Sequence, residues 1–228
     1  MKNGKPATPD ALHVAFVLDR SGSMSHLAEA VVSGVDEFVS ELRRDSGDAR
    51  FSLTAFDTRF EHIHFGVRLA DVPSLRETGY QPGGMTALFD AVAHTVLSTD
   101  ERLRAEGCDH EKVMVVVMTD GLENSSTDYT ARSLGDLIRA YDGRPNWTFV
   151  YLGAAHATLA DAQDMAGMLA FERGNAMRWQ AEDAAVRKSM TSLAHAATYR
   201  RQSRDLKSKQ VFADALQTEA DYREDSTS

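Results

Sequence analysis

Short runs of consecutive apolar residues alternate along the chain with longer stretches in which apolar residues recur every three or four positions. A continuous apolar run is typical of a strand buried on both faces of a sheet, whereas the longer spacing is typical of an amphipathic helix. The expected strands are residues 14–19, 51–56, 113–119 and 147–152, with a short candidate strand at 169–171. The expected helices are residues 24–43, 86–104, 130–141, 154–168 and 176–200.

Residues 60–69 follow a different pattern, in which neighbouring side chains alternate in character. The segment comes directly after the second expected strand, so we expect it to form an antiparallel hairpin partner at the edge of the sheet. His62 and His64 are two positions apart and are therefore expected on one face of this strand. The pair could hold zinc, but the sequence suggests no further ligand, and an exposed pair of edge histidines is the favoured interpretation.

The order of strands and helices predicts an α/β fold of the doubly wound type, with helices on both faces of a mostly parallel central sheet. The hairpin partner is expected to be its one antiparallel edge strand. Neither an internal repeat nor a linker interrupts the pattern, so we expect one domain over residues 10–200. Residues 201–228 form a charged C-terminal tail that we expect to be partly disordered.

Composition narrows the classes of partner. A chain of 228 residues with net charge −9 lacks the general excess of Lys and Arg that nonspecific nucleic-acid binding requires. Cys108 is the only cysteine, which excludes an intrachain disulfide and a cysteine-based metal site. No apolar run approaches the roughly 20 residues that span a bilayer, and residues 1–10 lack the apolar segment of a secretory signal. We expect a cytoplasmic protein that binds neither nucleic acid nor membrane.

The end of the first expected strand carries the most informative chemistry. Asp19, Ser21 and Ser23 are alternate residues, so in an extended backbone their side chains can converge, and Gly22 lets the chain turn into the next helix. One carboxylate and two hydroxyls are hard oxygen donors, which suit Mg²⁺ or Mn²⁺. Each of the three could instead serve only as a helix cap.

Two later segments offer further oxygens at the same edge of the sheet. Thr86 follows the turn Gly83-Gly84 at the start of an expected helix, and Asp120 follows the most hydrophobic strand, directly before a glycine. In an open α/β sheet, ligands bind beyond the carboxyl ends of the strands, where the strand order reverses. Taken alone, Thr86 would be read as a helix cap and Asp120 as a turn carboxylate.

Together these residues reproduce the motif Asp-x-Ser-x-Ser, then a distant Thr, then a distant Asp beside a Gly. The chain therefore resembles the von Willebrand factor A (vWA) domain family and its metal-ion-dependent adhesion site, and it fits the intracellular bacterial type best. The resemblance implies that one cation, Mg²⁺ or else Mn²⁺ or Ca²⁺, is bound by five residues: Asp19, Ser21, Ser23, Thr86 and Asp120.

The resemblance also implies a function. The cation would receive a Glu or Asp carboxylate from a partner protein, Asp120 would act through water or serine, and the last helix, residues 176–200, would move on binding. By analogy the chain would be a protein-binding module, not an enzyme, and an assembly or scaffold subunit in a bacterial stress-response or chaperone-type system. Other polar residues are expected on the rim of the site: Asp57, Asp90, Asn124, Ser125, Ser126 and Asp128.

Three other functions remain open at this point. The first is a Mg²⁺-dependent hydrolase or phosphoryl-transfer enzyme, although no phosphate-binding glycine motif accompanies the acidic residues. The second is a structural scaffold subunit with a vestigial site. The third is self-association, in which the acidic tail around Asp221, Glu224 and Asp225 supplies the carboxylate to a neighbouring copy.

Overall fold

The computed structural model describes residues 11–44, 48–120, 123–153, 166–171, 175–178 and 183–203. The strands are β1 (Leu12–Asp19), β2 (Ala49–Phe56), β3 (Phe60–Arg68), β4 (Lys112–Thr119), β5 (Trp147–Gly153) and β6 (Ala176–Arg178). The α-helices are α1 (Ala28–Arg44), α2 (Leu75–Thr78), α3 (Leu88–Glu106), α4 (Ala131–Asp142) and α6 (Asp183–Gln202). Two 3₁₀-helices are η1 (Gly22–Leu27) and η2 (Leu69–Asp71).

The strands form one sheet in the order β3-β2-β1-β4-β5-β6. Every neighbouring pair is parallel except β2 and β3, which are antiparallel. From β1 the chain winds outward through β2 to β3, and it then returns to the centre at β4 and winds the other way. The strand order therefore reverses between β1 and β4, and this is where a doubly wound sheet opens a ligand site.

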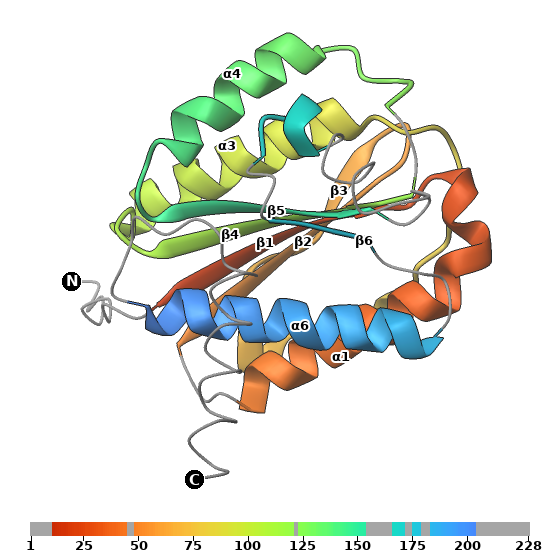
Figure 1. Cartoon of the computed structure of the whole chain (residues 1–228), viewed down its shortest axis with the longest axis horizontal. Coiled ribbons are helices and arrows are strands. Elements are labelled where there is room, and N and C mark those ends of the chain that lie inside the picture. The colour runs from red at the N-terminus through yellow and green to blue at the C-terminus, as the bar shows by residue number, and fades with distance from the viewer. Residues whose placement is uncertain are drawn as a thin grey trace, which may run out of the picture.

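Helices cover both faces of the sheet, with α1 and α6 on one side and α3 and α4 on the other (Figure 1). Along β1, Val14 and Phe16 pack toward α1 and α6, whereas Ala15 and Val17 pack toward α3. Successive side chains of a strand point to opposite faces, so a central strand covered on both sides must be apolar throughout. The expected doubly wound α/β fold with an antiparallel edge strand is confirmed.

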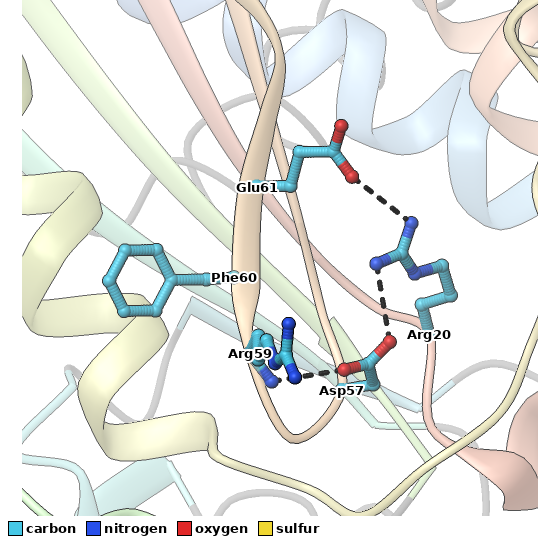
Figure 2. Close-up of a pocket in the computed structure, with 5 residues that line it drawn as sticks. All are labelled: Arg20, Asp57, Arg59, Phe60 and Glu61. Carbon is cyan, nitrogen blue, oxygen red and sulfur yellow. Dashed lines mark hydrogen bonds and ion pairs between the residues drawn. The ribbon is translucent and has the colours of Figure 1, made fainter.

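The turn between β2 and β3 is closed by its own first residue (Figure 2). The Asp57 N–H donates to the Arg59 carbonyl over 2.8 Å, and Asp57 Oδ1 accepts the Arg59 N–H over 3.0 Å. The register of β3 then shifts, because Thr54 pairs with His62 whereas Leu53 pairs with His64. This bulge places one extra residue in β3.

The bulge separates the two histidines that alternation placed on one face. His62 contacts Thr54 Oγ1 through Nδ1 at 2.9 Å, and its ring lies 5.2 Å from that of His94 on α3. His64 instead lines a small cavity with Val39 of α1. The zinc interpretation therefore fails, since the two imidazoles lie on opposite faces of the sheet. The favoured exposed pair is wrong as well, because His64 is buried and His62 is half-buried.

Several boundaries differ from those expected. Residues 22–27 form η1 instead of the first turns of α1, because Ser25 Oγ donates to the Gly22 carbonyl and competes with regular helical bonding. The short strand lies at 176–178, paired with β5, and not at 169–171, so the last helix starts at Asp183. The expected helix 154–168 and the tail after residue 203 fall largely or wholly outside the described residues. In the part of the chain that is described, no helix combines the length and hydropathy of a membrane span.

Both ends of the described domain meet at the amino ends of the strands. The Lys112 N–H donates to the Ala11 carbonyl over 3.2 Å, and its buried ammonium group donates to the Ser203 carbonyl over 2.9 Å. The buried Arg200 donates to Thr148 Oγ1 over 2.8 Å. These contacts fix the C-terminal end of α6 to the edge of the sheet formed by the amino ends of the strands. The carboxyl ends of β1 and β4 lie at the opposite edge.

A glycine sets the close approach of α1 and α6. A Cβ atom at Gly34 would lie 2.7 Å from Val186 Cγ1 and 3.1 Å from Met190 Cγ. We expect Gly34→Ala to lower the free energy of unfolding by about 1–3 kcal/mol, because overpacking exceeds the gain of about 1 kcal/mol in helix propensity. Urea denaturation measures the change.

The matched control is Gly135→Ala, in the buried face of α4. There the nearest atom to the added Cβ is the flexible Arg139 Nη1, at 3.4 Å. The same substitution should be neutral or stabilise the protein, since only the propensity changes. Equal effects at the two positions would contradict the close packing described at Gly34.

Candidate metal centre

The candidate site lies at the carboxyl ends of the two central strands. Asp19 is the last residue of β1, and Asp120 follows directly after β4. Because β1 and β4 are parallel neighbours in the register Leu18 opposite Met118, these two carboxylates emerge side by side. The position coincides with the reversal of strand order.

The carboxylate of Asp19 is fully buried and held from two sides. Oδ1 accepts the Ser21 N–H over 2.7 Å, and Oδ2 accepts the Thr119 hydroxyl over 2.5 Å. Burial raises the pKa of Asp19 above its usual value, although both hydrogen bonds act to lower it, and the negative charge of Asp120 raises it further. A bound cation would compensate this buried negative charge.

A chain of hydrogen bonds links four of the five predicted ligands. Ser21 Oγ lies 3.0 Å from Ser23 Oγ, and the Ser23 hydroxyl donates to Asp120 Oδ1 over 2.7 Å. Ser21 in turn is bonded through its N–H to Asp19. The structure therefore brings together residues that stand about a hundred positions apart in the sequence, 97 between Ser23 and Asp120.

The loop that carries Thr86 lies directly on the loop of Ser21 and Ser23. The Gly22 N–H donates to the Gly84 carbonyl over 3.2 Å. Gly84 has φ of +75°, and an added Cβ would lie 2.9 Å from Thr58 Oγ1, so both its backbone and its surroundings require glycine. Thr86 is buried, yet its hydroxyl makes no hydrogen bond with the described chain. It is an oxygen donor without a partner among the described residues, on the loop that contacts Gly22 between Ser21 and Ser23.

Asn124, predicted on the rim, holds Thr86 in place. Asn124 Oδ1 accepts the Thr86 N–H over 2.8 Å, and the Asn124 N–H donates to the Thr86 carbonyl over 3.0 Å. This pair of bonds ties the segment after β4 to the segment before α3. Asn124 is thus a positioning residue, and its side-chain oxygen is engaged with the backbone.

Two carboxylates near the rim serve the fold. Asp90 is buried and accepts the backbone N–H groups of residues 127–129. Glu123 accepts the Phe89 N–H at the start of α3 and those of residues 125–126. Negative charge at the first turn of a helix is favourable, so both residues stabilise the amino end of α3 that follows Thr86.

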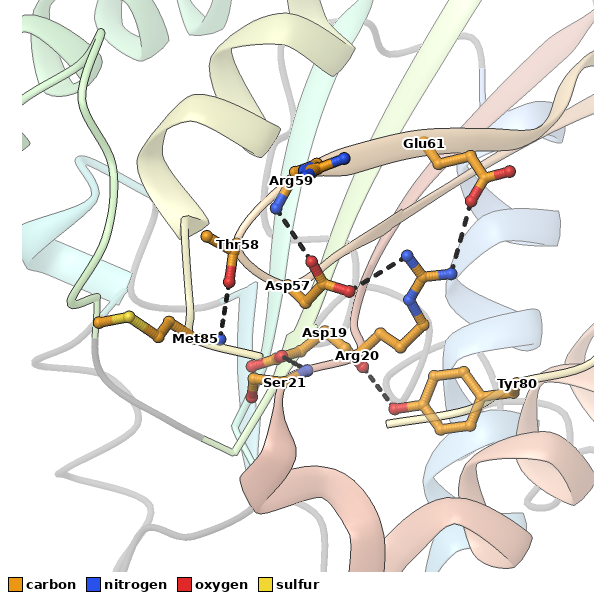
Figure 3. A network of polar contacts seen from close by, with 9 residues as sticks. All are labelled: Asp19, Arg20, Ser21, Asp57, Thr58, Arg59, Glu61, Tyr80 and Met85. Carbon is orange, nitrogen blue, oxygen red and sulfur yellow. Dashed lines mark hydrogen bonds and ion pairs between the residues drawn. The ribbon is translucent and has the colours of Figure 1, made fainter. Parts of the chain in front are cut away.

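Two residues that support the site were not predicted. The Tyr80 hydroxyl donates to the Asp19 carbonyl, and burial together with the charges of Asp19 and Asp120 raises the Tyr80 pKa, so it stays a donor (Figure 3). Thr119 could have been inferred, since it ends the strand beside β1. Tyr80 could not, because the loop before Gly83 carries no pattern that fixes its path.

The donor set is made of hydroxyls and two carboxylates. Among the described residues, no group of three or more His, Cys, Asp and Glu side chains is arranged to hold a metal ion. A cation at this edge would therefore depend on Ser and Thr oxygens in addition to Asp19 and Asp120. Such hard, partly neutral oxygens suit Mg²⁺ and exclude a preference for soft metals.

Comparison with known proteins identifies the domain type. The von Willebrand factor type A domain matches residues 13–184 of the chain. No curated protein matches it.

Three solved structures share the fold. Proximal thread matrix protein 1 from the mussel byssus has a TM-score of 0.59 at 16% identity, over 82% of this chain and 46% of that one. A von Willebrand factor type A structure from Catenulispora acidiphila has a TM-score of 0.58 at 18% identity, over 82% and 42%. The pilus adhesin SpaC from Lactobacillus rhamnosus GG has a TM-score of 0.60 at 15% identity, over 85% and 31%. At these identities the likeness shows the fold alone, and the chain spans less than half of each of the three proteins.

Proposed function

The chain belongs to the von Willebrand factor type A domain family, a family of protein-interaction modules, and from that premise we propose that it binds a partner protein through a Mg²⁺ ion at the candidate metal centre. The ion would be held by Asp19, Ser21, Ser23 and Thr86, with Asp120 acting through Ser23 or a water molecule. A Glu or Asp carboxylate of the partner would complete its coordination.

The spacing of the two serine hydroxyls carries the proposal. Neighbouring ligands of an octahedral Mg²⁺ with bonds of about 2.1 Å lie about 3.0 Å apart. Ser21 Oγ and Ser23 Oγ are separated by 3.0 Å. The bonds of Ca²⁺ are longer, roughly 2.3–2.6 Å, but its seven- and eight-coordinate shells bring neighbouring ligands equally close, so the spacing fits Mg²⁺ and does not by itself distinguish the two cations.

The distribution of charge explains why such an ion would attract a partner. Asp120 accepts the Ser23 hydroxyl and is suited to orient that ligand while staying outside the coordination sphere. With Asp19 as its one directly bound carboxylate and hydroxyls as its other protein ligands, the ion keeps one positive charge that its direct ligands do not compensate. An anionic oxygen from another protein is then the ligand that neutralises it, and binding would disappear with a chelator.

The comparisons support a binding module more than an enzyme. The similar structures include a pilus adhesin and a byssus matrix protein, although those names describe the whole proteins. Phosphoryl transfer usually places several carboxylates on its metal ions. In the part of the chain described here, no third acidic side chain joins Asp19 and Asp120, so no observation favours the hydrolase.

Thr86 provides the sharpest test, because its hydroxyl makes no hydrogen bond that the described residues would lose. We expect calorimetric titration to show Mg²⁺ binding to the wild-type protein, and Thr86→Val to weaken it by about tenfold or more while the melting temperature without Mg²⁺ stays unchanged. Thr127→Val, on an exposed loop, is the control. If folded wild-type protein binds neither Mg²⁺, Mn²⁺ nor Ca²⁺, the structural-scaffold interpretation replaces this proposal.

A further inference from the structure

A hollow of about 370 Å³ lies beside the candidate metal centre, between the loop of residues 19–23, here called the metal loop, and the turn from β2 to β3 (Figure 2). Charged side chains form most of its wall. Its lining residues are Arg20, Asp57, Arg59, Phe60 and Glu61.

Arg20 is held in the hollow with part of its donor capacity unused. Its guanidinium group donates to Asp57 Oδ2 over 3.2 Å and to Glu61 Oε2 over 3.5 Å. These are two separate long contacts, and neither is the bidentate pair that an arginine forms with a carboxylate at its strongest. The Nε atom of Arg20 is buried and has no hydrogen-bond partner among the residues that the structure describes.

Arg59 adds a second, free guanidinium group. Its backbone N–H is bonded to Asp57 Oδ1, whereas its exposed side chain makes no ion pair with the described chain. Both oxygens of Asp57 are therefore engaged, by Arg59 and by Arg20. The two arginines and the two carboxylates, Asp57 and Glu61, cancel in formal charge, but Arg20 is paired with both carboxylates. The guanidinium group of Arg59 has no such partner in the described chain, so the Arg59 side of the hollow is suited to an anionic acceptor (Figure 3).

One loop serves the hollow and the metal centre together. Arg20 stands between Asp19 and Ser21, and its backbone is fixed by an N–H bond to the Phe56 carbonyl over 2.6 Å and by the Gly83 N–H, which its carbonyl accepts over 2.9 Å. A group bound in the hollow therefore lies one Arg side chain away from the metal loop.

We propose that the hollow is a second anion-binding contact for the partner that reaches the cation, and that it receives a second acidic side chain of the same partner segment. The inference rests on the proposed function. Alternate side chains of an extended segment lie on one side, about 7 Å apart. This spacing is comparable to the length of the Arg20 side chain, which separates the metal loop from the hollow. The recognised segment is thus acidic-x-acidic, with one carboxylate on Mg²⁺ and the other against Arg59 and Arg20.

A peptide selection tests this pairing. Random heptapeptides with a fixed central Glu are selected on the immobilised protein in Mg²⁺, and those that EDTA releases are sequenced. We expect Asp or Glu to be enriched severalfold two positions from the central Glu. On Arg59→Glu the same selection should lose that enrichment and favour Lys or Arg there.

A matched control uses the other end of the same strand. Arg68→Glu makes the same change of charge at the end of β3 away from the metal centre, and it should select the same acidic peptides as the wild-type protein. Selection that depends on Mg²⁺ but shows no acidic preference at that spacing, or a preference that survives Arg59→Glu, would overturn the second contact alone. If no peptide is retained in Mg²⁺ and released by EDTA, the proposed function fails and the inference fails with it.

Discussion

Replacing Asp19 by asparagine is expected to remove Mg²⁺ binding almost completely while leaving the protein folded. Asparagine keeps the shape of the side chain, and the Thr119 hydroxyl can rotate to accept from the new amide. Because the substitution also removes a buried charge, the melting temperature without Mg²⁺ should not fall. In the wild-type protein, Mg²⁺ at about 100 times its Kd should add about 2.7 kcal/mol to the free energy of unfolding, and Asp19→Asn should show no such gain.

Thermal denaturation with and without Mg²⁺ measures both effects in one experiment. Asp128→Asn provides the control, since it removes an exposed carboxylate from the loop that follows β4 without touching the proposed ligands. It should keep the full Mg²⁺-dependent shift. Wild-type Mg²⁺ affinity in Asp19→Asn would show that this carboxylate is a structural anchor for Ser21 and Thr119 and not part of a metal site.

The second large effect is a loss of stability in acid caused by His13. This histidine is fully buried on β1; its Nδ1 lies 2.6 Å from Arg102 Nη2 and its Nε2 lies 2.9 Å from Ser52 Oγ. Nδ1 must accept from the arginine, so the ring is neutral. Burial, followed by the positive charges of Arg102 and Arg50, lowers the pKa of His13 from 6.5 to about 3.

Between pH 6.5 and about pH 3, His13 is protonated in the unfolded chain but neutral in the folded protein. The buried neutral ring therefore makes its full contribution to the free energy of unfolding above pH 6.5. This contribution is lost as the pH falls toward 3, at about 1.4 kcal/mol per pH unit. Urea denaturation of the wild-type protein and of His13→Gln should show a shallower pH dependence in the variant. Burial also lowers the pKa values of His62, His64 and His94, so part of the slope should remain.

The control for this experiment is His26→Gln, at an exposed position. It should keep the wild-type slope. An unchanged slope in His13→Gln would mean that the ring is protonated in the folded protein and that its contact with Arg102 is made in another way.

The sequence alone was sufficient for the parts of the site that lie next to buried strands. Asp19 and Asp120 each follow a continuous apolar run, so the parallel arrangement of those strands places them at one edge. The alternate positions of Ser21 and Ser23 also predicted that their hydroxyls converge. Whether the five residues bind a metal ion stays a prediction, as do the cytoplasmic location, the domain limits, the acidic tail and self-association.

What the sequence could not supply depends on contacts between loops. Nothing in the local pattern distinguishes the carboxylate of Asp57, which holds Arg20, from that of Asp90, which binds backbone N–H groups. The bulge that separates His62 from His64 inserts one residue into an otherwise regular alternation. Side chains that bond to a backbone far along the chain, as Asn124 does to Thr86, leave no periodic signal.

The meeting at Lys112 of residues 11 and 203, the first and last that the structure describes, has a practical consequence. Ala11 and Ser203 adjoin this one residue, at the edge of the sheet turned away from Asp19 and Asp120. A domain trimmed to residues 11–203 and attached at either of these two ends, to an affinity tag or a solid support, would be held at the edge of the sheet opposite the candidate metal centre. The metal centre and the hollow beside it would then face outward, open to whatever approaches from solution.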